Sequence, residues 1–261
     1  MNTYDTHAHL DHLENLDQAL SAADQAGVRA IVAVSMNLES CRRCLEIKRQ
    51  APRPPIYLGM GMHPSDANPA DVDAIKDLAR EYRADLAVIG EIGLDFWYKW
   101  VRKDQVKKQE QRTVYRALLE LAVELDLPPV IHSRGVWREC FETARDVGLS
   151  RAEFHWYSGP IDVLKDILDA GYYISTSPSV AYSPQSREVI EYAPLDRILI
   201  ETDSPVYYRN RDTGEEFQAE PKDVFRTLTA VSELKELDPQ EAVRQFNQNA
   251  EDFFGIAVED L

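Results

Sequence analysis

The amino-acid sequence predicts a single α/β domain over residues 1–261, folded as a (β/α)8 TIM barrel. Strand-like and helix-like segments alternate along the whole chain, and eight such pairs in about 250 residues is the usual size of this fold. No linker, low-complexity tract or short repeat divides the sequence. An open doubly wound sheet is the competing fold, and it is disfavoured because no glycine-rich phosphate loop follows the first strand.

Short apolar runs predict the strands, because the strands of a parallel sheet are covered on both faces. We expect them at Thr3–His7, Arg29–Ser35, Ile56–Met62, Leu86–Gly90, Pro129–His132, Ala152–His155, Tyr172–Thr176 and Arg197–Glu201. Longer amphipathic runs predict helices between them. We expect these at Leu13–Ala26, Leu38–Gln50, Pro69–Tyr82, Lys103–Leu125, Val136–Val147, Ile161–Ala170, Pro184–Tyr192 and Pro221–Leu234, with a closing helix at Pro239–Phe254.

Acidic residues outnumber basic residues by 45 to 29, which gives a formal net charge of -16. This balance argues against broad electrostatic capture of nucleic acid or of an anionic membrane, so a polyanionic substrate has to be held locally. No apolar run approaches the roughly 20 residues that span a bilayer, and the N-terminus lacks the basic and apolar regions of a signal peptide. We therefore expect a cytoplasmic protein with no membrane partner and no obligate protein partner.

The three cysteines do not indicate a disulfide framework or a structural zinc site. Cys41 and Cys44 have CxxC spacing, but they lie inside the helix expected to begin near Asn37, and no second pair exists. A zinc ribbon needs two such pairs. We interpret Cys41, Cys44 and Cys140 as ordinary helix thiols.

Histidine and carboxylate residues gather where the expected strands end. In a TIM barrel these ends form one face, on which active sites are built. Five of the six histidines lie there. The residues are His7 and His9 after the first strand, His63 after the third, Glu91 and Asp95 after the fourth, His132 and Arg134 after the fifth, His155 after the sixth, and Glu201 and Asp203 after the eighth.

This pattern predicts a site for two divalent ions, Zn2+, Mn2+ or Mg2+. His7 and His9 are two residues apart on an extended segment, so their rings project from the same face. Glu91 is the natural bridge between two ions, because a carboxylate has two ligand oxygens and an imidazole offers one nitrogen. We expect one ion to be held by His7, His9, Glu91 and Asp203, and the other by Glu91, His132 and His155.

The motifs DTHAHLD, GMHP, GEIGLDF, LPPVIHSR, HWYSG, ILIETDSP and QNAEDFF occur in this order from one end of the chain to the other. Together they resemble the TatD-like deoxyribonucleases, a family of the metal-dependent amidohydrolase superfamily. The resemblance implies a TIM barrel, two divalent ions and hydrolysis of phosphodiester bonds in nucleic acid. It also implies the same six metal ligands: His7, His9, Glu91, His132, His155 and Asp203.

Three segments depart from the family pattern. The family's basic RGKxNEP-like loop is replaced by VYYRNRDTGEEFQAEP, which keeps only Glu220 and Pro221 of its ending. HWYSG stands for the more usual HCFSG, and Gly135 stands where an Asp commonly follows HSR. None of these changes touches an expected ligand, so they concern substrate recognition.

Polar side chains beside the expected metal site suggest further roles. His63 and Arg134 are expected to contact a substrate phosphate. Asp5 and Glu201 are expected to orient the ligands, and Asp95 either orients a ligand or caps a loop. His12 we interpret as an ordinary polar residue beside Asp11, the expected cap of the first helix.

Aromatic residues in two loops suggest how an acidic protein binds nucleic acid. Phe96 to Tyr98 with Trp100 form one group, and Tyr207 with Tyr208 forms the other. Stacking on bases needs no positive charge. We expect Trp97, Trp100 and Tyr207 to bind bases, and Arg209 to assist.

The function predicted from these residues is a metal-dependent exonuclease that cleaves phosphodiester bonds at the ends of single-stranded DNA with a metal-activated water. Asp203, Glu91 and His63 are the expected catalytic residues. One alternative keeps the site but hydrolyses another ester or an amide, such as a lactone or an aminoacyl ester of RNA. Glu91 argues against it, because many such enzymes carry a carboxylated lysine on the fourth strand. The other alternative is a noncatalytic binding barrel.

Overall fold

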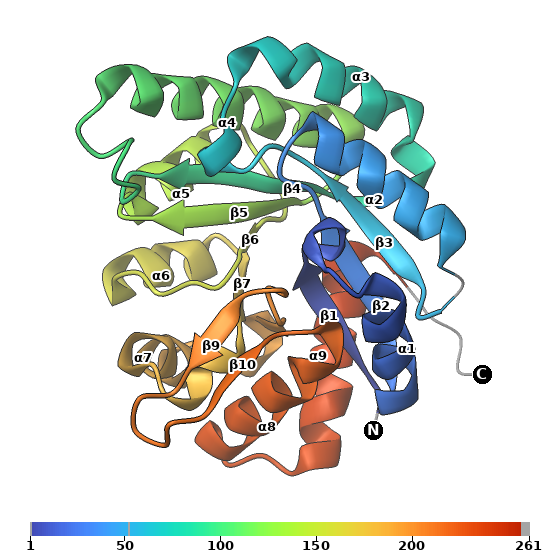
Figure 1. Cartoon of the computed structure of the whole chain (residues 1–261). Coiled ribbons are helices and arrows are strands. Elements are labelled where there is room, and N and C mark those ends of the chain that lie inside the picture. The colour runs from blue at the N-terminus through green and yellow to red at the C-terminus, as the bar shows by residue number, and fades with distance from the viewer. Residues whose placement is uncertain (1, 52, 257–261) are drawn as a thin grey trace.

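The computed structural model describes residues 2–51 and 53–256. Its main sheet has eight parallel strands, each paired with the next along the chain, and helices surround it (Figure 1). The predicted (β/α)8 barrel is confirmed. The strands are β1 (Thr3–Ala8), β2 (Val28–Val34), β3 (Ile56–Met60), β4 (Leu86–Asp95), β5 (Pro129–Arg134), β6 (Glu153–Phe154), β7 (Tyr173–Thr176) and β8 (Ile198–Ile200).

The helices follow the strands in alternation up to α8, and a further helix ends the described chain. The apolar residues of their inner faces pack against the outside of the sheet. The helices are α1 (Leu16–Ala26), α2 (Leu38–Gln50), α3 (Val72–Glu81), α4 (Gln105–Leu125), α5 (Trp137–Asp146), α6 (Ile161–Asp169), α7 (Pro184–Tyr192), α8 (Val224–Leu234) and α9 (Pro239–Phe254).

The first and last strands of the barrel meet through backbone hydrogen bonds. Ala8 forms an isolated parallel bridge with Ser204. The His9 N–H donates to the Ser204 carbonyl at 2.8 Å, and the Asp203 N–H donates to the His7 carbonyl at 3.0 Å. The ends of β1 and β8 are therefore held side by side, with three of the expected metal ligands at the junction.

Asp5 reinforces this junction from inside the protein. Its fully buried carboxylate accepts hydrogen bonds from Thr202 N at 2.9 Å and from Thr202 Oγ1 at 2.7 Å. Asp5 Oδ1 also accepts the His7 N–H at 3.5 Å. The carboxylate therefore contacts the backbone of one expected ligand and of the residue before another, and its orienting role stays a prediction.

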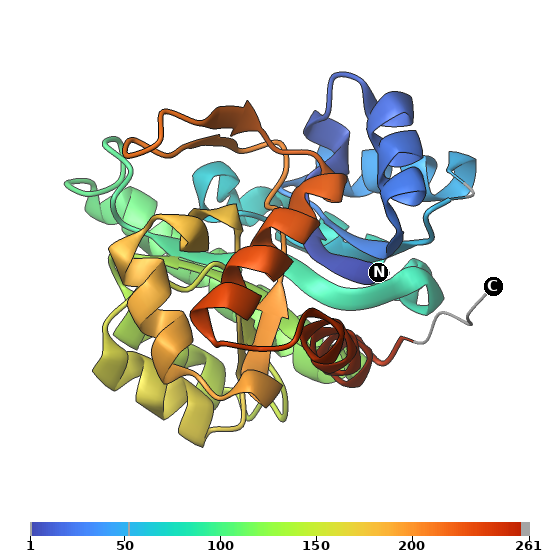
Figure 2. The same cartoon turned by 90° about the horizontal axis from the view of Figure 1, so that it is seen from below.

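Helix α9 closes the end of the barrel at which the strands begin (Figure 2). The Asn249 side chain donates to the carbonyl of Ile198, the first residue of β8, and Asn247 donates to the carbonyl of Asn2, just before β1. Phe253 joins Tyr4 in an apolar cluster at the same end. Substrate access is therefore left to the opposite end, where the strands finish.

Most expected boundaries agree with the structure, and α2, α7 and α9 begin and end at the predicted residues. Asn37 caps α2 by accepting the Ser40 N–H. The expected capping role of Asp11 is wrong: α1 begins at Leu16 after Asn15, and Asp11 lies in a separate 3-10 turn. The chain bends sharply there before the helix starts.

Two differences lie near the strand ends. β4 runs on to Asp95 rather than ending at Gly90, because its second half pairs with β5. The altered loop after β8 contains an antiparallel pair that the sequence did not predict, β9 (Tyr207–Arg209) and β10 (Glu216–Gln218). Arg226 of α8 holds this hairpin in place, because its guanidinium donates a hydrogen bond to Glu215 and lies over the Phe217 ring.

The three cysteines agree with the interpretation as ordinary helix thiols. Cys41, Cys44 and Cys140 are buried free thiols on helices. Burial raises the pKa of Cys41 to about 11, so its thiolate form is disfavoured at neutral pH. Within residues 2–51 and 53–256, every helix is too short or too polar to cross a bilayer.

Candidate metal centre

Side chains alternate in direction along β1, so His7 and His9, two residues apart, both point toward the same place in the interior. His7 is fully buried inside the strand, and His9 follows directly after its last residue. Their Nε2 atoms lie 3.4 Å apart. Two ring nitrogens that converge in this way present paired lone pairs to one small space, as two ligands of a single cation do.

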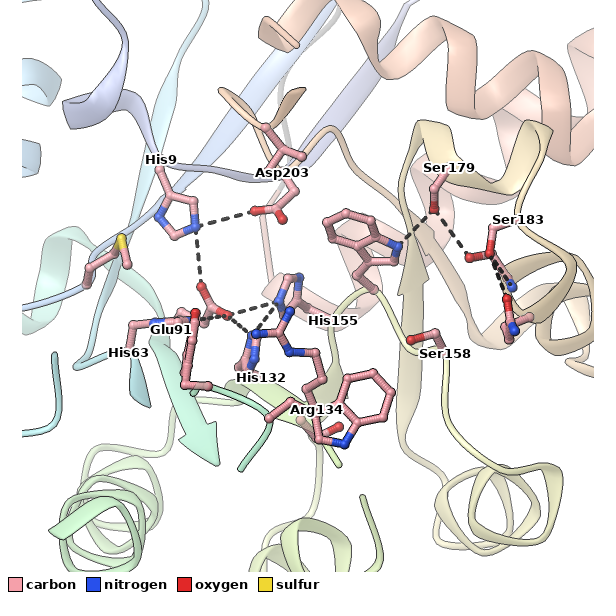
Figure 3. A pocket seen from close by; sticks show the side chains of 18 of the residues that line it. His9, His63, Glu91, His132, Arg134, His155, Ser158, Ser179, Ser183 and Asp203 are labelled. Carbon is pink, nitrogen blue, oxygen red and sulfur yellow. Dashed lines mark hydrogen bonds and ion pairs between the residues drawn. The ribbon is translucent and has the colours of Figure 1, made fainter. Parts of the chain in front are cut away.

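Glu91 faces two groups of histidines with its two oxygens. Its Oε2 lies 3.3 Å from His9 Nε2 and 3.4 Å from His7 Nε2. Its Oε1 lies 2.9 Å from His132 Nδ1 and 2.9 Å from His155 Nε2. Figure 3 shows this carboxylate at the centre of the converging side chains. The carboxylate is thus placed between the two groups, as the bridging role requires.

The first group has the dimensions of a tetrahedral metal site. Asp203 Oδ1 lies 3.5 Å from His7 Nε2 and 3.4 Å from His9 Nε2. The distances given above among these three atoms and Glu91 Oε2 are all 3.3 to 3.5 Å. Ligands about 2.0 to 2.1 Å from a tetrahedral Zn2+ lie about 3.3 to 3.4 Å from one another. The four side chains therefore fit a divalent cation.

The second group contains His132, His155 and Oε1 of Glu91. His132 Nδ1 and His155 Nε2 are 3.4 Å apart. His63 approaches the same oxygen, with its Nε2 3.6 Å from Glu91 Oε1. The atoms of His63, Glu91 and His132 are close enough to share a cation. The structure therefore places His63 beside the expected ligands.

The hydrogen bonds of His63 indicate a different role from that of its neighbours. Its Nδ1 accepts the backbone N–H of Ser65 at 3.1 Å. Burial lowers the pKa of His63 to about 3, so the ring is neutral. Nδ1 also lies 2.6 Å from Ser65 Oγ, which itself donates to Asp66, so Ser65 occupies Nδ1 and leaves Nε2 facing Glu91 and the site.

Carboxylates behind two of the expected ligands fix the ring orientations. Asp95 Oδ2 lies 3.0 Å from His132 Nε2, and Glu201 Oε1 lies 3.2 Å from His155 Nδ1. Ser175 donates to the other oxygen of Glu201 at 2.6 Å. Such partners hold a metal-binding imidazole in one tautomer and one orientation. Asp95 and Glu201 thus have the contacts expected of orienting residues.

Burial and mutual contact act in opposite directions on the pKa values of this cluster. Burial lowers the pKa of His9, but Asp203 and Glu91 outweigh it and raise that pKa to about 10. Burial also opposes ionisation of Glu91, yet the surrounding histidines, His155 first, hold its pKa well below the usual range. Protons on the imidazoles balance the carboxylates, so a divalent cation must displace protons when it binds.

Comparison with known proteins agrees with this geometry. The family model described as TatD related DNase matches residues 4–255. The chain belongs to this family. An uncharacterized metal-dependent hydrolase of Methanocaldococcus jannaschii is 30% identical over 256 residues, covering 96% of each chain. The deoxyribonuclease TATDN3 of Homo sapiens is 29% identical over 265 residues, covering 94% of this chain and 92% of the human protein.

Solved structures of the TatD family have the same fold. The structure of YjjV, a TatD homologue from Escherichia coli, superposes with a TM-score of 0.87 at 24% identity and covers 98% of both chains. A TatD family hydrolase from Entamoeba histolytica superposes with a TM-score of 0.84 at 22% identity, covering 97% of this chain and 98% of its own. The predicted resemblance to the TatD family is thereby confirmed.

A cavity of about 840 Å³ opens above the cluster, at the end of the barrel where the strands finish. Five of the expected metal ligands line it, as do His63, Arg134 and Trp97. Arg134 is held over the Tyr98 ring, and its Nε lies 2.7 Å from Asp95 Oδ2. Of the expected substrate-binding residues, these three are therefore in position to touch a substrate bound at the cluster.

The remaining expected substrate-binding residues lie outside the cavity lining. Trp100 is 56% exposed and stacks on Tyr98, which itself lines the cavity. Tyr207 and Arg209 are exposed on β9, where Arg209 faces Glu216 at 3.6 Å. The strand alternation of β9 buries Tyr208 between them. Sequence alone placed these residues in loops near the site, but it gave no orientation.

Several residues that sequence reasoning missed do line the cavity. His12, interpreted above as an ordinary polar residue, lies at the cavity with its ring stacked 5.9 Å from that of His9. Others come from the segments after β5, β6 and β7, including the first residues of α5 and α7. A polar run directly after a strand, TSPSVAYSPQS, was the available signal for the last of these segments. They are Trp137, Trp156, Ser158, Ser179, Tyr182, Ser183, Gln185 and Ser186.

Proposed function

We propose that this TatD family protein is a metal-dependent phosphodiesterase that removes nucleotides from the ends of single-stranded nucleic acid. Two divalent cations, Zn2+, Mn2+ or Mg2+, are its proposed cofactors. The observation that carries the proposal is the position of Glu91, whose two oxygens face separate groups of imidazoles. The family's name and the name of the human relative support nucleic acid as the substrate.

The distances divide the proposed ligands into two groups. His7, His9 and Asp203 would hold one cation, His132 and His155 would hold the other, and Glu91 would serve both. Bound cations at such a site supply Lewis acidity at a phosphoryl group and lower the pKa of a water molecule. Imidazole and carboxylate ligands suit zinc and manganese better than magnesium, which prefers oxygen.

The protein's own groups would then bind and orient the substrate. Nε2 of His63 faces the site and can contact a phosphoryl oxygen, to which the Arg134 guanidinium can donate. Asp203 is buried at the cavity floor, where its carboxylate can orient the attacking water and accept its proton. Proton transfer by a positioned carboxylate contributes on the order of 10² to 10⁴ in rate.

The cavity favours a chain end over the middle of a long strand. Arg134 is the one arginine or lysine among the cavity-lining residues of the described chain. An enzyme that follows a long backbone needs many such contacts and loses affinity steeply with salt. With one contact and a net charge of -16, the protein can hold the phosphate at the cluster and little of the backbone beyond it.

The test is an activity panel on protein loaded separately with Zn2+, Mn2+ and Mg2+, with metal content measured by elemental analysis. Linear single-stranded DNA and RNA should be shortened from an end, and Glu91→Gln should lose activity and part of its metal while it remains folded by circular dichroism. Cleavage of closed circular single strands at the same rate would contradict end recognition. Hydrolysis of a lactone or an aminoacyl ester, with no diester cleaved, would contradict the phosphodiesterase proposal.

A further inference from the structure

The cavity continues beyond the metal cluster into a region that has no assigned role. This region is formed by the segments after β5, β6 and β7, including the first residues of α5 and α7, and we call it the serine-tryptophan arm. Figure 3 shows Ser158, Ser179 and Ser183 on the opposite side of the cavity from His9 and His63. The arm is defined by Trp137, Trp156, Ser158, Ser179, Ser183 and Gln185.

Trp156 is held in place by contacts of both its backbone and its ring. It directly follows His155 and has a φ of 39°, a left-handed conformation that bulky residues rarely adopt. Its N–H donates to Ser175 Oγ at 3.0 Å, its Nε1 donates to Ser179 Oγ at 2.9 Å, and its ring packs 5.6 Å from Tyr208. Such conformations persist where surrounding contacts hold them, and they cluster at ligand sites.

The arm combines indole surfaces with uncharged hydrogen-bonding groups. Among the described residues, the charged and imidazole side chains of the lining belong to the metal cluster, to His12 beside it and to Arg134. Ser183 donates to the Gln185 side-chain oxygen at 3.5 Å, which turns the Gln185 amide nitrogen away from Ser183. This chemistry matches an uncharged planar group with a hydroxylated substituent, as in the base and sugar of a nucleoside.

The arm offers a phosphate no cationic partner. Among the described residues that define it, none is charged, so a phosphate placed there would gain no charge-assisted hydrogen bond from a basic side chain. We propose that the serine-tryptophan arm binds the terminal nucleoside of the substrate, so that strands whose bound end carries no phosphate are preferred. The proposal rests on the proposed phosphodiesterase function in one respect: the scissile phosphate is taken to lie at the metal cluster.

Nucleotide binding to the metal-loaded protein tests the arm without relying on turnover. The ligands are a nucleoside 5′-monophosphate, the 3′-monophosphate, the 3′,5′-bisphosphate and inorganic phosphate. Whichever phosphate of the bisphosphate occupies the cluster, the other is carried toward the arm. Three of the four tryptophans line the cavity, so quenching of intrinsic fluorescence reports binding, with calorimetry as a second readout.

We expect the bisphosphate to bind at least about tenfold more weakly than the tighter monophosphate, because the second phosphate lacks a charge-assisted hydrogen bond. We expect inorganic phosphate to bind more weakly than that monophosphate as well, since it leaves the arm empty. A bisphosphate that binds as tightly as the monophosphates would overturn the proposal. So would equal binding of inorganic phosphate and the monophosphates, or no nucleotide binding at all.

A matched pair of variants sharpens the test. Gln185 follows the proline that opens α7, and Gln240 follows the proline that opens α9, away from the cavity. Gln185→Lys places a cation in the arm, so affinity for the bisphosphate should rise by about fivefold or more. Gln240→Lys adds the same charge elsewhere and should leave every affinity unchanged. Equal gains in the two variants would show that net charge, and not the arm, decides binding.

The two proposals can fail separately. Discrimination between monophosphate and bisphosphate, together with no hydrolysis of any diester, would uphold the arm and contradict the phosphodiesterase. Hydrolysis of oligonucleotides without that discrimination would uphold the phosphodiesterase and contradict the arm.

Discussion

The metal cluster and the aromatic loops around it differ in how their side chains are held. His7 and Glu91 lie on strands and are at most 1% exposed, whereas Trp97 and Trp100 lie on a loop and are 61% and 56% exposed. Strand pairing fixes the direction of a side chain, because successive residues face opposite sides of the sheet. Loop residues depend on individual contacts instead. Substitutions in the cluster should therefore lower activity strongly. Substitutions of the aromatic residues should have effects that differ from one residue to the next.

The largest effect is expected from Asp203→Asn. The amide is a poorer metal ligand and cannot accept a proton, so kcat should fall by on the order of 10² to 10⁴ while the barrel remains folded. Activity assays beside circular dichroism measure this. Asp212→Asn, in the exposed hairpin loop, is the matched control and should retain full activity. A folded Asp203→Asn protein with near-normal turnover would remove Asp203 from the mechanism.

Asp95→Asn should have the next largest effect, on metal affinity. The carboxylate contacts both His132 and Arg134, and loss of a partner behind a metal-binding histidine typically costs 10- to 100-fold in affinity or activity. Equilibrium dialysis should show that one cation is lost more readily than the other, because His132 belongs to one group only. Unchanged affinity for both cations would mean that Asp95 merely shapes the loop.

Trp97→Ala should raise the Michaelis constant for oligonucleotides by about tenfold, since stacking on a base contributes on the order of 1 to 3 kcal/mol. Trp97 lines the cavity, whereas Trp100 and Tyr207 do not. Trp100→Ala and Tyr207→Ala should therefore change that constant less than about twofold. If Trp100→Ala matched Trp97→Ala, the expectation from sequence would be right and the binding surface would extend outside the cavity.

Gly135→Ala tests how Trp97 is held. Gly135 has a φ of 79°, and a Cβ there would lie 2.3 Å from Cδ1 of the Trp97 ring. The substitution should displace the indole and raise the Michaelis constant nearly as much as Trp97→Ala, with a stability loss of about 1 kcal/mol in chemical denaturation. In the Trp97→Ala background the same substitution should have no further effect on binding. An additive effect would show that the two residues act independently.

Arg209→Ala should have the smallest effect, because Arg209 is exposed and already faces Glu216. Each phosphate contact on a single strand contributes about -0.7 to the log-log slope of affinity against salt. The slope should stay the same in the variant within error. A slope shallower by about 0.7 would instead assign Arg209 to a substrate phosphate, as the sequence suggested.

Sequence analysis predicted the positions of side chains well where the strands of the barrel fix the direction in which those side chains point. The spacing of His7 and His9, and the position of each expected ligand at a strand end, were enough to predict that these six side chains come together, and even the longer β4 does not move Glu91 away from them. Orientation in loops was beyond this method. Tyr208 is buried because a short hairpin forms around it, and three-residue strands show too little alternation to be recognised.

The cavity walls show a second limit. Trp156 occupies the cavity because its backbone is left-handed, and that conformation depends on hydroxyl groups contributed by β7 and the turn after it. Helix propensity and hydrophobic periodicity say nothing about such long-range contacts. His12 was interpreted as an ordinary polar residue beside a helix cap at Asp11, but it lies in a 3-10 turn and its exposed side chain lines the cavity.

The junction between β1 and β8 has a consequence for how the protein is made. Asp5 and Thr202, which hold the junction, are 197 residues apart in the sequence, and Asp203 follows Thr202 directly. A ribosome releases the chain from its N-terminus, so the first two histidines emerge long before their carboxylate partner. The proposed nuclease would therefore lack its complete centre while it is still surrounded by messenger and ribosomal RNA, and would acquire it only when the last strand docks.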